Sequence, residues 1–213
     1  MSSERGQLIT FEGGDGCGKS TQLKLTAAWL EEQGRRVLLT REPGDTPLGA
    51  ELRGILLKGE FRPVPECELL LFLADRAQHV REVILPTLES GIWVLCDRYS
   101  DSTMAYQLAG RKLADLDGLS DLLAFAEAGV SPELTLWLDL PVTEALHRIR
   151  SRTAMGEEST RLDEEAQSYH EKVHAAFASL NDMHKRIERI DAMHSIEVVQ
   201  EQIQTTFRKR GLA

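Results

Sequence analysis

The sequence predicts an α/β fold in which a parallel five-stranded sheet carries helices on both faces. Strand-like apolar runs alternate with helical patterns along the 213 residues, which is typical of this fold class. Runs such as Ile92 to Cys96 are apolar at every position, as expected of strands that are buried on both faces. A glycine-rich segment between the first run and the first helix has the spacing of a phosphate-binding loop.

The predicted strands and helices follow one another in a regular order. Strands are predicted at 7–12, 36–40, 92–97, 134–140 and, on the weakest pattern, 186–191. Helices are predicted at 19–33, 47–58, 66–90, 115–128, 142–151, 163–183 and 195–208. Because Pro86 lacks a backbone N–H, we expect it to kink or split the 66–90 helix. No repeat or Pro/Ser-rich linker interrupts the pattern, so we expect a single domain over 1–213.

Composition limits the classes of partner. The net charge of −9 disfavours a nucleic acid or an anionic membrane as partner. No apolar run is long enough for a membrane span, and the first residues lack the pattern of a signal peptide. The cysteines are odd in number and lack metal-ligand spacing, which favours reduced thiols. Cytoplasmic localisation is therefore expected, with Cys67 and Cys96 as core residues.

The glycine-rich segment carries the most information. Gly13, four further residues and then Gly18-Lys19-Ser20 match the pattern G-x-x-x-x-G-K-[ST] between a strand and a helix. Such a loop turns backbone N–H groups toward the phosphates of a nucleotide, and the helix N-terminus adds partial positive charge. The motif predicts that Lys19 reaches the β- and γ-phosphates and that Ser20 holds Mg²⁺. The predicted ATP-binding residues are Gly13, Gly14, Asp15, Gly16, Cys17, Gly18, Lys19, Ser20 and Thr21.

Charged residues follow the other predicted strands where those strands end. The second strand leads into Arg41-Glu42, and the third leads into Asp97-Arg98. The carboxyl ends of parallel strands meet at one edge of a sheet, where ligands of doubly wound folds bind. Considered alone, each of these residues is typical of the solvent-exposed start of a loop that follows a strand. Together with the phosphate loop, they indicate a site for anionic ligands.

A phosphate-binding loop is shared by several classes of nucleotide-binding protein, and the rest of the chain narrows the choice. No Asn-Lys-x-Asp motif for reading guanine is present, and the chain is short for a motor ATPase. Arg148, Arg150 and Arg152 precede a polar stretch that ends at Arg161. Such a segment could close over a transferring phosphoryl group, so the sequence predicts a P-loop NTPase fold with an arginine-bearing lid at about 148–163.

Over residues 7–208 the chain resembles the bacterial thymidylate kinases, which belong to the P-loop nucleoside monophosphate kinases. The motifs that carry the resemblance are Phe11-Glu12-Gly13, Arg41-Glu42-Pro43-Gly44, Leu71 to Arg76, Asp97-Arg98-Tyr99, Ser102 to Gln107, and the lid. The resemblance implies phosphoryl transfer from ATP to dTMP, giving dTDP and ADP for dTTP synthesis, with Mg²⁺ as cofactor. It also implies a homodimer, with helices 66–90 and 115–128 as candidate interface.

The resemblance also assigns residues to dTMP. Phe72 would stack on the thymine, Arg76 and Gln107 would reach its polar edge, and Ser102 and Thr103 would lie beside it. Without the resemblance, we would read Phe72 as a core residue among leucines. Tyr106 would pack under the deoxyribose, and Asp15 would accept a hydrogen bond from the 3′-hydroxyl. Arg41 and Arg98 would clamp the phosphate, since a guanidinium matches phosphate oxygens.

Two carboxylates at strand ends compete for the metal ion. Asp97 and Asp139 each end an apolar run, and the resemblance favours Asp97 together with Ser20. Glu42 is a weaker candidate for the water shell of the metal ion.

The phosphate loop lacks the arginine that some members of the family place there. The expected catalytic groups are therefore Lys19 and Arg98 with one or more of Arg150, Arg152 and Arg161 in the lid. Two alternatives stay open on the sequence: another deoxynucleotide or deoxynucleoside kinase, and a P-loop module that senses nucleotides without turnover.

Overall fold

A computed structural model describes residues 5–58, 61–156 and 158–212. Within these residues, five parallel strands form one sheet in the order β2-β3-β1-β4-β5. Their bounds are β1 Leu8–Glu12, β2 Val37–Arg41, β3 Trp93–Asp97, β4 Leu134–Asp139 and β5 Ile187–Asp191. Each predicted strand agrees with an observed strand to within one residue at either end. The parallel sheet and the α/β class are confirmed.

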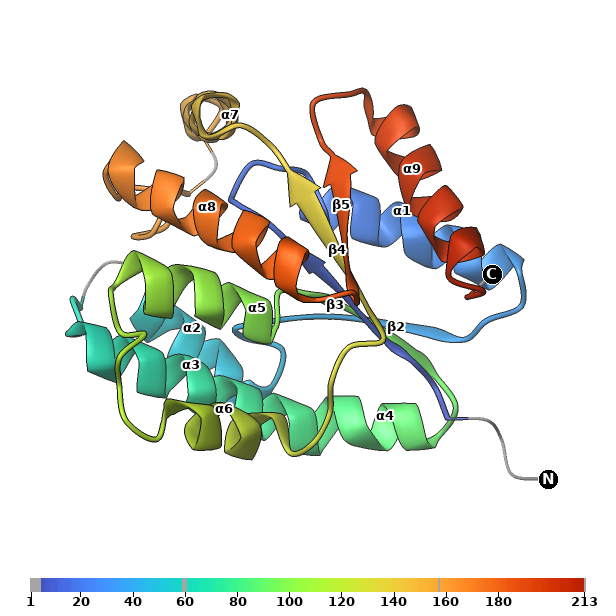
Figure 1. Cartoon of the computed structure of the whole chain (residues 1–213), viewed down its shortest axis with the longest axis horizontal. Helices are drawn as coiled ribbons and strands as arrows, with labels where there is room; N and C mark the ends of the chain where they lie inside the picture. Colours follow the sequence, from blue (N-terminus) through green and yellow to red (C-terminus); the bar gives the residue numbers. More distant parts are fainter. Residues whose placement is uncertain (1–4, 59–60, 157, 213) are drawn as a thin grey trace.

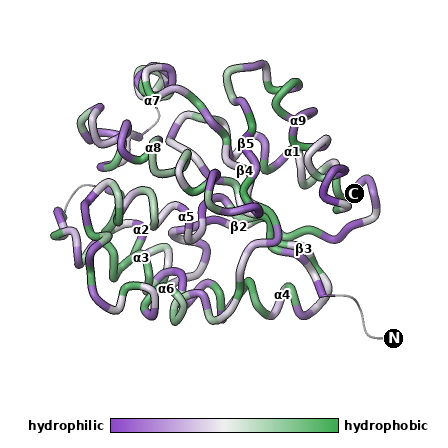
Figure 2. Tube along the Cα trace, viewed as in Figure 1, coloured by the Kyte–Doolittle hydropathy of each residue, from purple (hydrophilic) through white to green (hydrophobic). Residues whose placement is uncertain are grey.

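Helices cover both faces of the sheet (Figure 1). On one face, α1 (Lys19–Glu32) and α9 (Ile196–Lys209) pack against each other. On the other face lie α3 (Pro65–His79), α4 (Leu85–Glu89), α6 (Leu119–Glu127) and α8 (Gln167–Met183). The sequence pattern explains this arrangement, since hydrophobic residues recur along the strands and alternate with hydrophilic ones along the outer helices (Figure 2).

The core follows from that pattern. Ile9 and Phe11 from β1 and Leu136 from β4 are fully buried against the face that α1 and α9 cover. Leu8 and Val94 pack on the other face against the residues that precede α4. The central strands are thus held from both sides, and their carboxyl ends are fixed relative to one another.

The long helix predicted at 66–90 is divided. It consists of α3, a π-helical turn η1 (Val80–Ile84), and α4, in which Pro86 lies within the first turn. A proline cannot donate to the carbonyl one turn earlier, and the wider turn before it accommodates that loss. The expected interruption at Pro86 is therefore confirmed.

One helical segment was not predicted. After β3 the chain forms α5 (Ser100–Thr103) and the π-helical η2 (Met104–Gly110). Only a short stretch separates this segment from β3, and its buried polar residues hide the usual apolar periodicity. The remaining helices are α2 (Pro47–Leu57) and α7 (Val142–Ala154). No described helix has the length and apolar character needed to cross a membrane.

Candidate active site

The phosphate loop lies between β1 and α1 at the carboxyl edge of the sheet. Gly18 adopts a left-handed conformation, with φ of 94°, at the start of α1. Gly13 has φ of 133°, and a Cβ there would lie 2.6 Å from the carbonyl oxygen of Leu138 in β4. Glycine alone suits both positions because it lacks a side chain. The loop is therefore packed tightly against the sheet.

Lys19, the first residue of α1, folds back over this loop. Its Nζ donates to the carbonyl oxygens of Gly13 at 3.2 Å and Gly14 at 2.9 Å. The side chain is buried, so its charge is directed at the loop. Next to it, the Ser20 hydroxyl donates to the Asp97 carboxylate at 2.8 Å.

The Ser20–Asp97 pair fits a magnesium ion better than the alternative carboxylate does. Both side chains are oxygen donors and line one cavity with the phosphate loop, and Mg²⁺ prefers oxygen ligands with water and phosphate completing its shell. Asp139 is instead engaged by His174 and Arg189, each at 2.6 Å. Among the described residues, no three His, Cys, Asp or Glu side chains form a metal-binding group. Protein ligands alone would therefore not complete such a site.

Arg98 lies directly beyond β3 and has an unusual backbone. Its φ of 72° lies in the left-handed region, which residues other than glycine rarely adopt. The guanidinium donates to the Gly13 carbonyl, the Asp15 carboxylate at 2.7 Å and the Tyr106 hydroxyl at 3.1 Å. Burial opposes ionisation of Asp15, but the charges of Arg98 and Lys19 outweigh it and hold the pKa of Asp15 well below its usual range.

Glu12, the last residue of β1, fixes the chain around Arg98. Its buried carboxylate accepts hydrogen bonds from the backbone N–H of Tyr99 at 2.8 Å and of Ser102 at 3.2 Å, and from the Ser102 hydroxyl. These are the residues on the C-terminal side of Arg98. Burial, followed by the nearby carboxylate of Asp101, raises the pKa of Glu12 to about 7. This role of Glu12 was not predicted from the sequence.

Three guanidinium groups converge near the same point. Arg53 on α2 donates to the Pro43 carbonyl at 2.7 Å. Burial and the positive charges of Arg41 and Arg98 lower the pKa of Arg53. Neighbouring like charges are unfavourable until an anion lies between them, so the cluster is suited to a phosphate group. Arg53 was not predicted, because α2 carries no motif that separates it from a surface arginine.

A second cavity adjoins the cavity at the phosphate loop. Predicted residues that line it are Asp15, Phe72, Arg76, Arg98, Ser102, Thr103, Tyr106 and Gln107. Five residues line both cavities: Asp15, Glu42, Arg53, Arg98 and Thr160. The two spaces therefore meet at the arginine cluster, with Arg41 on the side of the phosphate loop.

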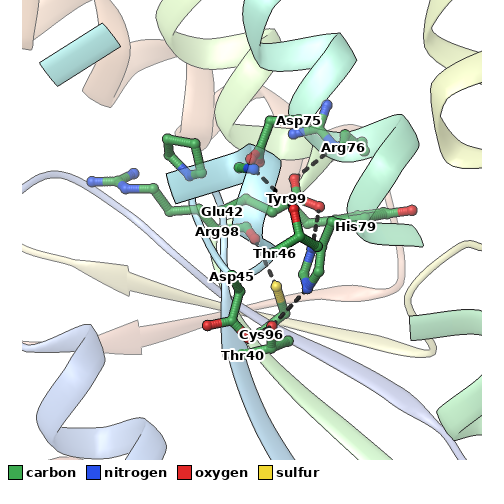
Figure 3. Close-up of polar contacts among 12 residues, drawn as sticks. Thr40, Glu42, Asp45, Thr46, Asp75, Arg76, His79, Cys96, Arg98 and Tyr99 are labelled. Carbon is green, nitrogen blue, oxygen red and sulfur yellow. Dashed lines mark hydrogen bonds and ion pairs between the residues drawn. The ribbon is translucent and has the colours of Figure 1, made fainter. Parts of the chain in front are cut away.

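Glu42 lines both cavities, and both of its carboxylate oxygens are engaged by neighbouring side chains. Its buried carboxylate accepts from Arg76 at 2.8 Å and contacts His79 at 2.9 Å, and His79 contacts Thr40 in turn (Figure 3). Both oxygens of Glu42 are thereby engaged. The expectation that Glu42 contributes to a metal water shell stays a prediction. Glu42 fixes the guanidinium of Arg76 at the wall of the second cavity.

Known proteins resemble this chain over most of its length. The sequence model of the thymidylate kinase family matches residues 11–203. A thymidylate kinase from Gloeobacter violaceus is 47% identical over 199 residues, covering 93% of this chain and 92% of the relative. One from Nostoc punctiforme is 45% identical over 206 residues, covering 95% and 96%. The chain belongs to the thymidylate kinase family.

For a thymidylate kinase family member, the lid arginines are of particular interest, and the structure separates them. Arg148 and Arg152 lie on α7 and line the cavity at the phosphate loop. Arg150 is exposed and lines neither cavity. The helix extends to Ala154, three residues beyond the predicted end at 151. Glu157, also expected in the lid, lies outside the described residues.

Arg161 is placed differently from the expectation. It is buried, and its guanidinium donates to Glu68 at 2.6 Å and to the Leu56 carbonyl at 3.1 Å. It lines neither cavity, so in this arrangement its charge neutralises Glu68 rather than a phosphate. The helix expected from residue 163 begins at Gln167 instead. Cys67, expected in the core, is exposed, whereas Cys17 and Cys96 are buried.

Proposed function

We propose that this thymidylate kinase family member transfers a phosphoryl group from ATP to dTMP, giving dTDP and ADP. The observation that carries the proposal is the pair of adjoining cavities. One is lined by the phosphate loop, the other by aromatic and hydrogen-bonding residues, and Asp15 and Arg98 line both. Phosphoryl transfer requires chiefly that donor and acceptor be positioned and their charge neutralised.

The donor side would use the phosphate loop. The backbone N–H groups from Gly16 to Thr21 and the ammonium of Lys19 would hold the ATP phosphates. Ser20 and Asp97 would hold Mg²⁺, which supplies positive charge at the phosphate oxygens. Their 2.8 Å contact and their place beside the loop support this assignment.

The acceptor side would use the second cavity. Phe72 would stack on the thymine, since its ring packs at the cavity wall beside the core that contains Tyr106. Arg76 and Gln107 would meet the polar edge of the base, with Ser102 and Thr103 beside it. Tyr106 would pack against the deoxyribose. Asp15, held by Arg98, would accept from the 3′-hydroxyl.

The arginine cluster would neutralise the transferring group. Arg41, Arg53 and Arg98 would hold the dTMP phosphate, because their like charges favour an anion between them. Arg152 lines the donor cavity and is the lid arginine whose position best suits the γ-phosphoryl, with Arg148 beside it. Arg150 and Arg161 would need a different placement to take part.

The exposed hydrophobic residues of α3 and α6 support a homodimer. The two helices pack together, and Leu70, Leu122 and Phe125 are 53%, 39% and 71% exposed. Exposed apolar surface of this kind is typical of a protein–protein interface. Cytoplasmic localisation is proposed because Cys17, Cys67 and Cys96 are free thiols, as expected in a reducing compartment.

The experiment that tests the proposed function is a coupled assay of ADP release. We expect turnover with dTMP, much lower turnover with dGMP, AMP and thymidine, and loss of turnover in Lys19→Ala. Faster turnover with another nucleotide would favour a different nucleoside monophosphate kinase. Binding of ATP and dTMP without any ADP release would favour a sensing module.

A further inference from the structure

The buried carboxylate of Glu68 on α3 accepts hydrogen bonds from three side chains. Gln107 donates from Nε2 at 2.9 Å, and Arg161 donates at 2.6 Å. Arg111 donates twice, each time at 3.2 Å. Burial opposes the charge, but the hydrogen bonds from Arg111, Gln107 and Arg161 lower the pKa of Glu68. The carboxylate is therefore ionised and can only accept hydrogen bonds.

This contact determines which way the amide of Gln107 points. A carboxylate that only accepts must face the NH₂ group, so the carbonyl oxygen Oε1 is turned away from Glu68. Within the described residues, Oε1 of Gln107 receives no hydrogen bond. The side chain lines the second cavity. Gln107 therefore offers the cavity an acceptor, whereas a free glutamine could offer either group.

Arg76 supplies the complementary donor in the same cavity. Its Nε donates to Glu42 at 2.8 Å and its Nη1 donates to Thr103 at 2.9 Å, which fixes the guanidinium plane. An arginine cannot accept a hydrogen bond. An acceptor at Gln107 and a donor at Arg76 match a pyrimidine with N3–H and a 4-carbonyl. Cytosine has the opposite pattern, with an N3 acceptor and a 4-amino donor.

We propose that Glu68 is a positioning residue that fixes the amide of Gln107 and thereby selects thymine or uracil over cytosine. The inference rests on the proposed function, in which this cavity holds the base of dTMP. Glu68 does not line the cavity itself, so it would act on the base through Gln107. Glu68 also accepts a hydrogen bond from Arg161, which holds the segment around Arg161 next to α3.

The test is the variant Glu68→Gln, in which the amide at position 68 can both donate and accept. The Gln107 amide is then free to turn. We expect the ratio of kcat/KM for dTMP to that for dCMP to fall at least about tenfold, as expected for one mispaired polar group. The ratio of dTMP to dUMP stays unchanged, because both bases carry N3–H and a 4-carbonyl. Neither ratio depends on the fraction of folded enzyme.

Two further measurements complete the test. Arg111→Gln removes a different partner of Glu68 and leaves the contact with Gln107, so both ratios are expected to match the wild type. In the wild-type protein, the side-chain NH₂ protons of Gln107 are expected to exchange slowly with solvent, with or without dTMP. This measurement decides the question if Glu68→Gln does not fold.

An unchanged dTMP to dCMP ratio in an active Glu68→Gln protein would overturn the inference, as would an equal change in both ratios. Fast exchange of the Gln107 amide protons in the wild type would do the same. Absence of wild-type turnover with dTMP would instead reject the proposed function, so the two failures are distinguishable.

Discussion

At the scale of single residues, the site depends on side chains that are held before any substrate arrives. The guanidinium of Arg98 is fixed by Gly13, Asp15 and Tyr106. The strained backbone at Arg98 is held in turn because the carboxylate of Glu12 accepts hydrogen bonds from the backbone N–H groups of Tyr99 and Ser102. Preorganisation of this kind lowers the reorganisation needed when charge develops in a transition state.

Replacing Arg98 tests its position between the cavities. In Arg98→Ala the Asp15 carboxylate loses its ion-pair partner, and under the proposed function the dTMP phosphate would lose a fixed donor. We expect kcat/KM for dTMP to fall by about 10² to 10³, the range for removal of one preorganised charge-stabilising group. Steady-state kinetics measure this effect. Arg208→Ala, on the exposed side of α9, should keep wild-type kinetics, and a similar loss in both variants would contradict the assignment.

The buried carboxylate of Glu12 predicts a pH dependence of stability. Its pKa is raised from 4.5 to about 7 in the folded protein, so between these values the folded state holds a proton that the unfolded chain has released. The contribution of Glu12 to the free energy of unfolding is therefore complete below about pH 4.5 and is lost as the pH rises through about 7. Glu12→Gln keeps the shape and has no such titration. Urea unfolding from pH 5 to 8 should show the free energy of unfolding of wild type falling relative to that of the variant as the pH rises.

A constant difference between wild type and Glu12→Gln across that range would contradict the prediction. A difference that moves in favour of the wild type at higher pH would mean that the carboxylate is stabilised in its charged form by Arg98.

At the scale of elements, the phosphate loop is positioned by its contact with β4. The carbonyl of Leu138 approaches Gly13 so closely that no side chain fits there. Gly44, after β2, similarly leaves room for the side chain of Arg53 and has φ of 114°. In both cases the absence of a side chain on glycine allows one element to approach another closely.

Two glycines in the same loop provide a matched test of this packing. In Gly13→Ala, the added Cβ would meet the Leu138 carbonyl at 2.6 Å with φ of 133°. We expect a loss of roughly 1–3 kcal/mol in the free energy of unfolding. In Gly14→Ala, the Cβ would have no atom within 4 Å, and φ is not in the left-handed range. Denaturant unfolding of both variants should separate them, and equal stabilities would refute this account of the loop.

At the scale of the whole molecule, the fold was predictable from the sequence, because buried parallel strands leave long apolar runs that only a two-sided core explains. The phosphate loop was predictable because its glycines and lysine stand at fixed spacing. The sequence could not predict the roles of Arg53, Glu12 and Glu68, since these roles depend on contacts with residues distant in the chain. The burial of Arg161 was missed for the same reason: its partner Glu68 lies 93 residues away.

The assembly also belongs to this scale. Leu70 on α3 and Leu122 on α6 are exposed on helices that pack together. We expect Leu70→Glu combined with Leu122→Glu to convert a dimer into a monomer, because charges in an apolar interface would be desolvated without partners. Light scattering after gel filtration measures the mass. Leu25→Glu, at a leucine of α1 that is 39% exposed, is the matched control and should leave the mass unchanged. A monomeric wild type would contradict the proposal.

The central claim is that the two cavities hold donor and acceptor together, on either side of Asp15 and Arg98. The most direct measurement uses an adenosine and a thymidine joined through their 5′ positions by a polyphosphate chain. We expect this compound to compete with both ATP and dTMP and to bind more tightly than either, since one molecule would fill both sites. Competition with only one of the two substrates would show that the sites are not adjoining and would contradict the account.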